Sequence, residues 1–115
     1  MNKFKPKRDK TTKYYALSID PVAQYSEKEI DEIMQFVLNQ MGDDNIEICY
    51  TVEKKKANGR NHIHCYVNCQ QRKKLIKMVR LGFSSVSYHQ QDIYDLQGWK
   101  NYIIKDGIAI KTIKN

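Results

Sequence analysis

The sequence predicts an α+β fold in which an antiparallel sheet carries helices mainly on one face. Two segments, 46–53 and 62–67, alternate like strands and are joined by a polar loop that contains the turn dipeptide Asn58-Gly59. Two other segments, 27–41 and 71–81, place apolar residues at helical spacing. A hairpin flanked by amphipathic helices favours a sheet covered by helices.

The remaining elements complete an order of five strands and three helices. The first strand is expected over 14–19, ended by Asp20-Pro21. After the second helix we expect a strand over 83–92, a short helix over 96–105 and a last strand over 108–113. This order is typical of a ferredoxin-like or RRM-like sheet.

The two long helices carry recognisable end signals. Ser26 and Glu29 form a capping box that opens the first helix, and Gly42 is placed to stop it. Gly82 is expected to end the second helix. A stripe of cations lines the outer face of that second helix: Lys73, Lys77 and Arg80.

The chain has 115 residues and a net charge of +7, and this charge is unevenly distributed. Residues 1–13 carry six basic side chains against one acid, and residues 54–80 carry nine basic side chains and no acid. Such polarity favours an oriented surface for an anionic partner such as nucleic acid. We expect residues 1–13 to be a flexible basic arm, either solvated or in contact with that partner, and residues 14–115 to form one domain.

The composition also narrows the protein class. With 41% hydrophobic and 29% charged residues, the chain should fold rather than stay disordered. It has no apolar run long enough to span a bilayer and no signal-peptide pattern. Its three cysteines include no Cys-x-x-Cys pair, which argues against a disulfide framework. We expect an intracellular protein with reduced thiols and no membrane partner.

The segment His62-Ile63-His64 is the strongest chemical signal. Alternate side chains of a strand leave the same face, so both imidazoles project together and could bind one metal ion. The alternative is a pair of partly buried histidines on a sheet face.

Glu53 extends this signal across the expected hairpin. Neighbouring strands lie about 5 Å apart, so Glu53 can reach an ion held by His62 and His64. Two imidazoles and one carboxylate suit a divalent ion such as Mg²⁺ or Mn²⁺ and leave coordination positions open. Glu53 could instead be an exposed acid that pairs with Lys54 or Lys55.

A structural zinc site is a competing arrangement of the same region. It would use both histidines together with Cys65 and Cys69. Strand alternation, however, sends Cys65 to the face opposite His64, and Cys69 lies beyond the strand end. Buried or half-buried thiols are therefore the expected state of these cysteines.

Tyr102 and Lys105 lie three residues apart on the expected last helix and so share one face. A tyrosine hydroxyl has a pKa of about 10 and is mostly protonated at neutral pH. A nearby ammonium group favours the phenolate and can neutralise charge that develops on a phosphate. The chain has eight tyrosines, so this pair indicates a functional site only in combination with Glu53, His62 and His64.

Three segments in order resemble the HUH endonucleases, named for their His-hydrophobic-His motif. More narrowly, the chain resembles the catalytic domain of Rep proteins, which start rolling-circle replication of small circular single-stranded DNA viruses and related plasmids. The segments are 14–20, His62-Ile63-His64 with Glu53 upstream, and 102–107, and the similarity covers roughly residues 14–113. The resemblance implies that the helix with the nucleophile lies near the metal site.

The resemblance also implies a reaction. Tyr102 would attack a phosphodiester in a single-stranded stretch of an origin hairpin and form a 5′-phosphotyrosine link. Glu53, His62 and His64 would hold Mg²⁺ or Mn²⁺, and Lys105 would activate the tyrosine or position the phosphate. The partners would be single-stranded DNA and possible host replication proteins, with the protein in the nucleus or cytoplasm depending on the host.

Contacts to DNA are expected at the basic tip of the hairpin, beside the metal ligands. Four cations form this candidate surface: Lys54, Lys55, Lys56 and Arg60. The alternative is that they belong to a solvated loop.

Two other functions remain open from the sequence. A non-catalytic module that binds single-stranded nucleic acid would explain the charge, the aromatic residues and the element order. A small single-tyrosine transposase of the same superfamily would keep the chemistry but act on different DNA.

Overall fold

The computed structural model describes residues 14–42, 45–93, 95–104 and 107–114, so the expected arm over 1–13 lies outside the described residues. The elements in chain order are β1 (Tyr14–Pro21), α1 (Glu27–Met41), β2 (Glu47–Lys54), β3 (Asn61–Asn68), α2 (Arg72–Gly82), β4 (Val86–Asp92), α3 (Leu96–Ile103) and β5 (Lys111–Lys114). No helix in these ranges is both long and apolar enough to cross a membrane.

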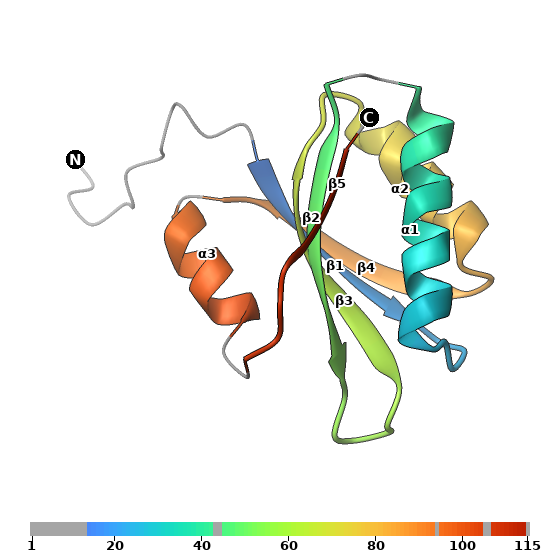
Figure 1. Ribbon diagram of the computed structural model, residues 1–115. Helices are drawn as coiled ribbons and strands as arrows, with labels where there is room; N and C mark the ends of the chain where they lie inside the picture. Colours follow the sequence, from blue (N-terminus) through green and yellow to red (C-terminus); the bar gives the residue numbers. More distant parts are fainter. Residues whose placement is uncertain (1–13, 43–44, 94, 105–106, 115) are drawn as a thin grey trace, which may run out of the picture.

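The five strands form one open sheet in the order β4-β1-β3-β2-β5 (Figure 1). Every neighbouring pair is antiparallel. The inner order β4-β1-β3-β2 is that of a ferredoxin-like sheet, and β5 adds a fifth strand beside β2. The predicted α+β fold class is therefore confirmed.

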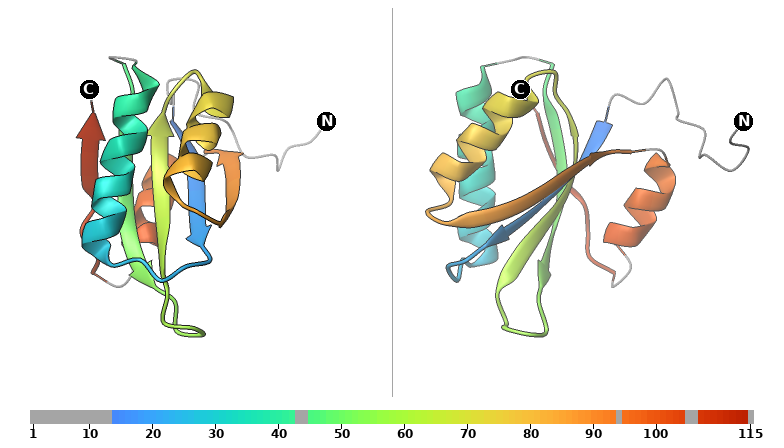
Figure 2. Two further views of the ribbon diagram at one scale, coloured as in Figure 1. Left: turned by 90° about the vertical axis from the view of Figure 1, so that its right-hand side faces the viewer. Right: turned by 180° about the vertical axis from the view of Figure 1, so that it is seen from behind.

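The helices divide unequally between the two faces of the sheet. Helices α1 and α2 cover one face, and α3 lies against the other (Figures 1 and 2). The main core fills the space beneath α1 and α2, with Leu17, Ile63 and Val79 among its fully buried members. A smaller cluster beneath α3 contains Ala16, Tyr66 and Ile103. Strand alternation thus assigns odd and even residues of β1, β2 and β3 to different cores.

Helix α1 begins and ends as predicted. The backbone N–H of Glu29 donates to Ser26 Oγ at 3.1 Å, and the N–H of Ser26 donates to the Glu29 carboxylate at 2.9 Å. These two bonds satisfy backbone donors that a helix start leaves without intrahelical partners. They also hold the pKa of Glu29 below its usual value. At the other end, Gly42 adopts φ 66°, a left-handed conformation that glycine tolerates best.

The end of α2 differs from the prediction. Gly82 lies within the helix rather than after it, and a Cβ at this position would come 2.7 Å from Ile33 Cγ2 of α1. Glycine is therefore needed for close packing of the two helices. Phe83, expected in a strand, is fully buried and closes α2 by donating its N–H to Val79 O. Consequently β4 begins only at Val86.

The last two elements are shorter than expected. Helix α3 ends at Ile103 rather than at 105, and β5 begins at Lys111 rather than at 108. Strand β5 is held by pairing with β2 and by Lys111, whose ammonium donates to Glu27 and Asp31 of α1. The C-terminal strand therefore links the sheet edge to the helical layer.

Candidate metal centre and neighbouring tyrosine

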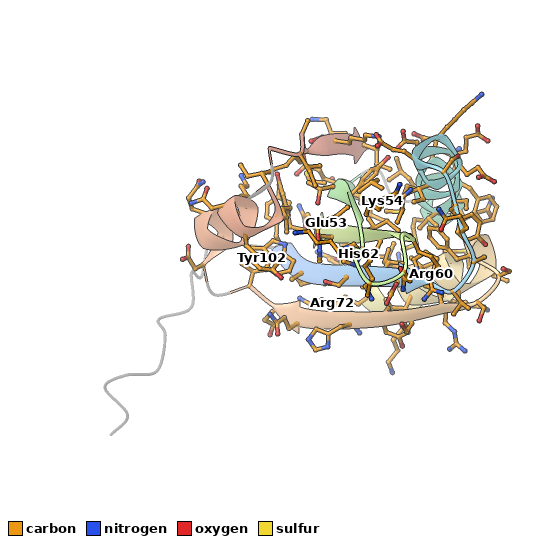
Figure 3. All side chains as sticks on the ribbon, turned by 90° about the horizontal axis from the view of Figure 1, so that it is seen from below. Glu53, Lys54, Arg60, His62, Arg72 and Tyr102 are labelled. Carbon is orange, nitrogen blue, oxygen red and sulfur yellow. The ribbon has the colours of Figure 1, made fainter. Side chains whose placement is uncertain are left out.

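The register of β2 and β3 brings the three predicted metal ligands together. Glu53 lies directly opposite His62, and Thr51 lies opposite His64. Directly opposed residues of an antiparallel pair share a face. All three candidate ligands therefore project from the face that carries α3, away from the main core that holds Val52 and Ile63. Glu53 and His62 are labelled in Figure 3.

The ligand atoms of Glu53, His62 and His64 all lie within 4.8 Å of one another. The Nε2 atom of His62 and Oε1 of Glu53 are 3.1 Å apart, and the two imidazole centroids are 4.7 Å apart. The side chains of His62 and Glu53 are 15% and 18% exposed, so the group is sheltered but reachable from solvent. Two nitrogen donors and a carboxylate within this span fit a divalent cation. In the described part of the chain, this is the one cluster of histidine, cysteine and acidic ligands with such a geometry.

A residue of the neighbouring strand β1 contacts one of the candidate ligands. Ser18 lies opposite His64 in the β1–β3 pair, and its Oγ is 3.3 Å from His64 Nδ1. Hydrogen bonds of this kind orient the ring of a metal-binding histidine and set its tautomer. Ser18 therefore restricts the ring that is most buried of the three ligands.

Helix α3 places two aromatic side chains over His64. Asp95 caps the helix by accepting the N–H of Gly98 at 3.0 Å. Trp99 donates its indole N–H to the carbonyl of Cys65 at 3.0 Å, which ties the helix to β3. The ring centroid of Tyr102 lies 5.9 Å from that of His64, and the ring centroid of Trp99 lies 6.2 Å from that of His64. Helix α3 thus places Tyr102, the predicted nucleophile, beside the group of candidate metal ligands (Figure 3).

Tyr102 is more exposed than four other tyrosines of the described chain. Its side chain is 49% exposed, which leaves room for a substrate. The Tyr14 hydroxyl donates to Glu47, and this bond, together with burial, raises the pKa of Tyr14 to about 12. Burial likewise raises the pKa of three other tyrosines: Tyr15, Tyr50 and Tyr66. The raised pKa values disfavour the phenolate form of these four tyrosines.

The cysteines lie elsewhere. Cys65 is fully buried in the core beneath α1 and α2, and burial raises the pKa of its thiol. Cys69 belongs to the same core. Neither thiol is part of the cluster formed by Glu53, His62 and His64. The geometry therefore favours the histidine and carboxylate set over the zinc alternative.

The four cations predicted to contact DNA differ in their exposure and in their ion pairing. Lys54 and Lys56 are exposed, while the ammonium of Lys55 lies 2.5 Å from Asp20 Oδ2. Arg60 is half-buried at the far end of the hairpin loop (Figure 3). The four residues surround the hairpin tip, but Lys54 follows Glu53 in the strand and so leaves the opposite face. Lys105 lies outside the described residues.

Two residues near the cluster were not predicted from the sequence. Trp99 precedes Tyr102 by three positions, and this spacing on a helix could have indicated that the two rings touch. Alternation of β1 places Ser18 and Leu17 on opposite faces of the sheet. Only the β1–β3 register, however, shows that Ser18 reaches His64. No model of a known protein family matches the chain, and a search of curated proteins finds no relative.

Proposed function

We propose that this protein is a metal-dependent DNA endonuclease and strand transferase of the HUH type, which initiates replication by nicking and rejoining single-stranded DNA at an origin. The observation that supports the proposal most strongly is the convergence of Glu53, His62 and His64 with Tyr102. The first three come from one hairpin, and the fourth comes from a helix far along the chain. A structural role for the histidine pair gives no reason for an exposed phenol at this place.

In the proposed reaction, the Tyr102 Oη attacks the phosphorus of a phosphodiester. The new Oη–P bond forms while the P–O3′ bond breaks, and the leaving 3′ oxygen gains a proton that balances the one lost by the phenol. The products are a 5′-phosphotyrosine and a free 3′-hydroxyl. Attack by a 3′-hydroxyl on the phosphotyrosine reverses the reaction without ATP.

The residues divide this task between them. Glu53, His62 and His64 would hold Mg²⁺ or Mn²⁺, which would polarise the scissile phosphate when bound. Ser18 holds the His64 ring, and Trp99 holds the Tyr102 ring. A role for Lys105 in activating Tyr102 or positioning the phosphate rests on the resemblance to Rep proteins.

The proposed partner is an origin hairpin with a single-stranded segment. The net charge of +7 favours binding to a phosphate backbone. The exposed lysines at the hairpin tip, Lys54 and Lys56, are the proposed phosphate contacts, although Lys54 leaves the strand on the face opposite Glu53.

The direct test is formation of a covalent adduct. The protein is incubated with Mn²⁺ and with a labelled library of single-stranded sequences and hairpin loops, and adducts that survive denaturing electrophoresis are counted. Tyr102→Phe should abolish the adduct and leave DNA binding unchanged. The matched control is Tyr14→Phe, which removes a phenol from the same sheet face and should leave adduct formation intact.

Other outcomes assign the protein differently. If DNA is shifted on native gels but no sequence gives an adduct, the protein is a binding module. If Tyr94→Phe abolishes the adduct and Tyr102→Phe does not, the nucleophile is misassigned. A dimer in solution that prefers transposon-end hairpins would favour the transposase alternative.

A further inference from the structure

We propose that the groove between α2 and β4 is a second nucleic-acid site, which binds the backbone of a single DNA strand on the sheet face opposite the metal cluster. The groove encloses about 520 Å³. Residues of α2 form one wall and residues of the edge strand β4 form the other. Figure 2 shows these two elements side by side. This inference rests on the proposed function in one respect, because its occupant is taken to be the strand that Tyr102 would cut.

The charge of the groove is the first argument. Three cations of α2 line it, Lys73, Lys77 and Arg80, and the lining residues that the structure describes include no acid. All three cations are exposed, and none forms an ion pair with another described residue. By contrast, Arg72 on the same helix is paired with Asp92 at 2.8 Å. The uncompensated charge therefore lies within the groove.

The spacing of these cations suits a polymer. Seven positions separate Lys73 from Arg80, so they extend over roughly 10 Å along the helix axis. A row of phosphates in one strand can meet such a row of cations, whereas a single small anion would need only one of them.

The opposite wall supplies groups that recognise unpaired nucleotides. Tyr88 of β4 lines the groove and is 41% exposed, and Gln90 lies two residues further along the same strand face. Aromatic side chains beside a cationic track are typical of sites for single strands, because every base offers a face for stacking. A duplex keeps its bases stacked inside and would leave Tyr88 without a role.

The register also connects the groove to the metal cluster. His64 lies opposite Ser18, and Ser18 lies opposite His89 of β4. Two strand spacings, roughly 10 Å, therefore separate His64 from the sheet edge. Tyr88 and Gln90 flank His89 and point to the groove side. A strand leaving the cluster would cross β1 and β4 and then enter the groove.

The test compares oligonucleotides of about 6 and about 20 nucleotides, a range that brackets typical single-strand site sizes. Fluorescence anisotropy is measured with Mn²⁺ in a Tyr102→Phe background, so that the DNA stays intact. The groove variant is Lys73→Gln/Lys77→Gln/Arg80→Gln, and its matched control Lys28→Gln/Lys74→Gln/Lys114→Gln removes the same charge elsewhere. Tyr88→Leu is an independent variant that keeps the charge.

The groove variant should lose at least tenfold in affinity for the long oligonucleotide and less than twofold for the short one. The slope of log K against log salt should fall by about 2 for the long oligonucleotide, because each single-strand phosphate contact contributes about 0.7. Tyr88→Leu should weaken only long-oligonucleotide binding, by several-fold. The proposal is overturned if the groove variant behaves like the matched control, or if it weakens both lengths equally.

Two further measurements separate a nucleic-acid site from a site for an acidic protein, and the groove proposal from the proposed nuclease function. If polyglutamate binds as tightly as DNA and loses affinity in the groove variant, an acidic protein is the better occupant and the nucleic-acid assignment is wrong. Adduct formation across the library of single-stranded sequences and hairpin loops, measured with Tyr102 present, tests the nuclease separately. Its absence would contradict the proposed function while leaving a length-dependent loss of binding as support for the groove.

Discussion

Trp99 stacks on Tyr102, with ring centroids 5.4 Å apart and ring planes 26° apart. The indole N–H of Trp99 is bonded to the Cys65 carbonyl, so the tyrosine is positioned by a contact to β3 as well as by its own helix. The position of the proposed nucleophile therefore depends on a residue without an evident chemical role of its own.

Trp99→Ala should lower the rate of adduct formation by about tenfold or more, because small displacements of a reacting group lower rates strongly. Trp99→Phe keeps an aromatic surface but loses the indole N–H, and should have a smaller effect. Single-turnover kinetics with Mn²⁺ measure both rates. Stabilisation by Mn²⁺ should remain in both variants, since Trp99 is not one of the candidate ligands and Ser18 still contacts His64. An unchanged rate in Trp99→Ala would show that Trp99 does not position Tyr102.

Mn²⁺ should stabilise the protein against thermal unfolding, because an ion that binds only the folded state adds about 2.7 kcal/mol at one hundred times its Kd. Scanning calorimetry with and without EDTA measures the effect. His62→Ala, His64→Ala and Glu53→Gln should each reduce it. His89→Ala is the matched control, since this third histidine is exposed and outside the cluster. Equal losses in all four variants would argue against the site.

Neutralising Lys54 and Lys56 together should weaken single-stranded DNA binding and reduce its salt dependence, with a slope change of about 1.4. Lys55→Gln should change the affinity less than either single exposed lysine, because Asp20 already pairs with the Lys55 ammonium. Salt titrations of binding by anisotropy separate these cases. A dominant effect of Lys55→Gln would mean that the ion pair opens when DNA binds.

Gly82→Ala should destabilise the fold by about 1–3 kcal/mol, the usual range for inserting a methyl group into a packed interface. The added Cβ would lie 2.7 Å from Ile33 Cγ2, so α1 and α2 have to move apart. Urea unfolding measures the free energy. Leu81→Ala at the neighbouring, 63% exposed position should change it far less. A stable Gly82→Ala variant would show that Ile33 can rotate away.

Much of the fold was predictable from the sequence because local patterns and tertiary packing agree. The capping box at Ser26, the turn at Gly59 and the alternation of β1 each specify one local structure. The boundary at Phe83 was wrong, because an apolar residue suits a strand and a helix end equally well and only burial decides. The role of Gly82 also escaped prediction, since close contact with Ile33 depends on how two distant helices cross.

The candidate site was predictable where its residues are close in sequence. Glu53, His62 and His64 follow from one hairpin and its alternation. Tyr102 could be placed near them only through the resemblance, because no local rule specifies where α3 docks. The groove beside α2 was visible only as a stripe of cations, since the sequence does not tell that β4 forms its other wall.

All three ligand candidates belong to the β2–β3 hairpin, whereas the proposed nucleophile belongs to α3, whose only fully buried residue in the described chain is Ile103. Segments with few buried contacts open at lower free energy than central strands. Warming should therefore release α3 while the hairpin that carries the candidate metal ligands stays folded. In that state the protein would still bind Mn²⁺ but would no longer form the proposed adduct, so loss of the proposed activity would precede global unfolding.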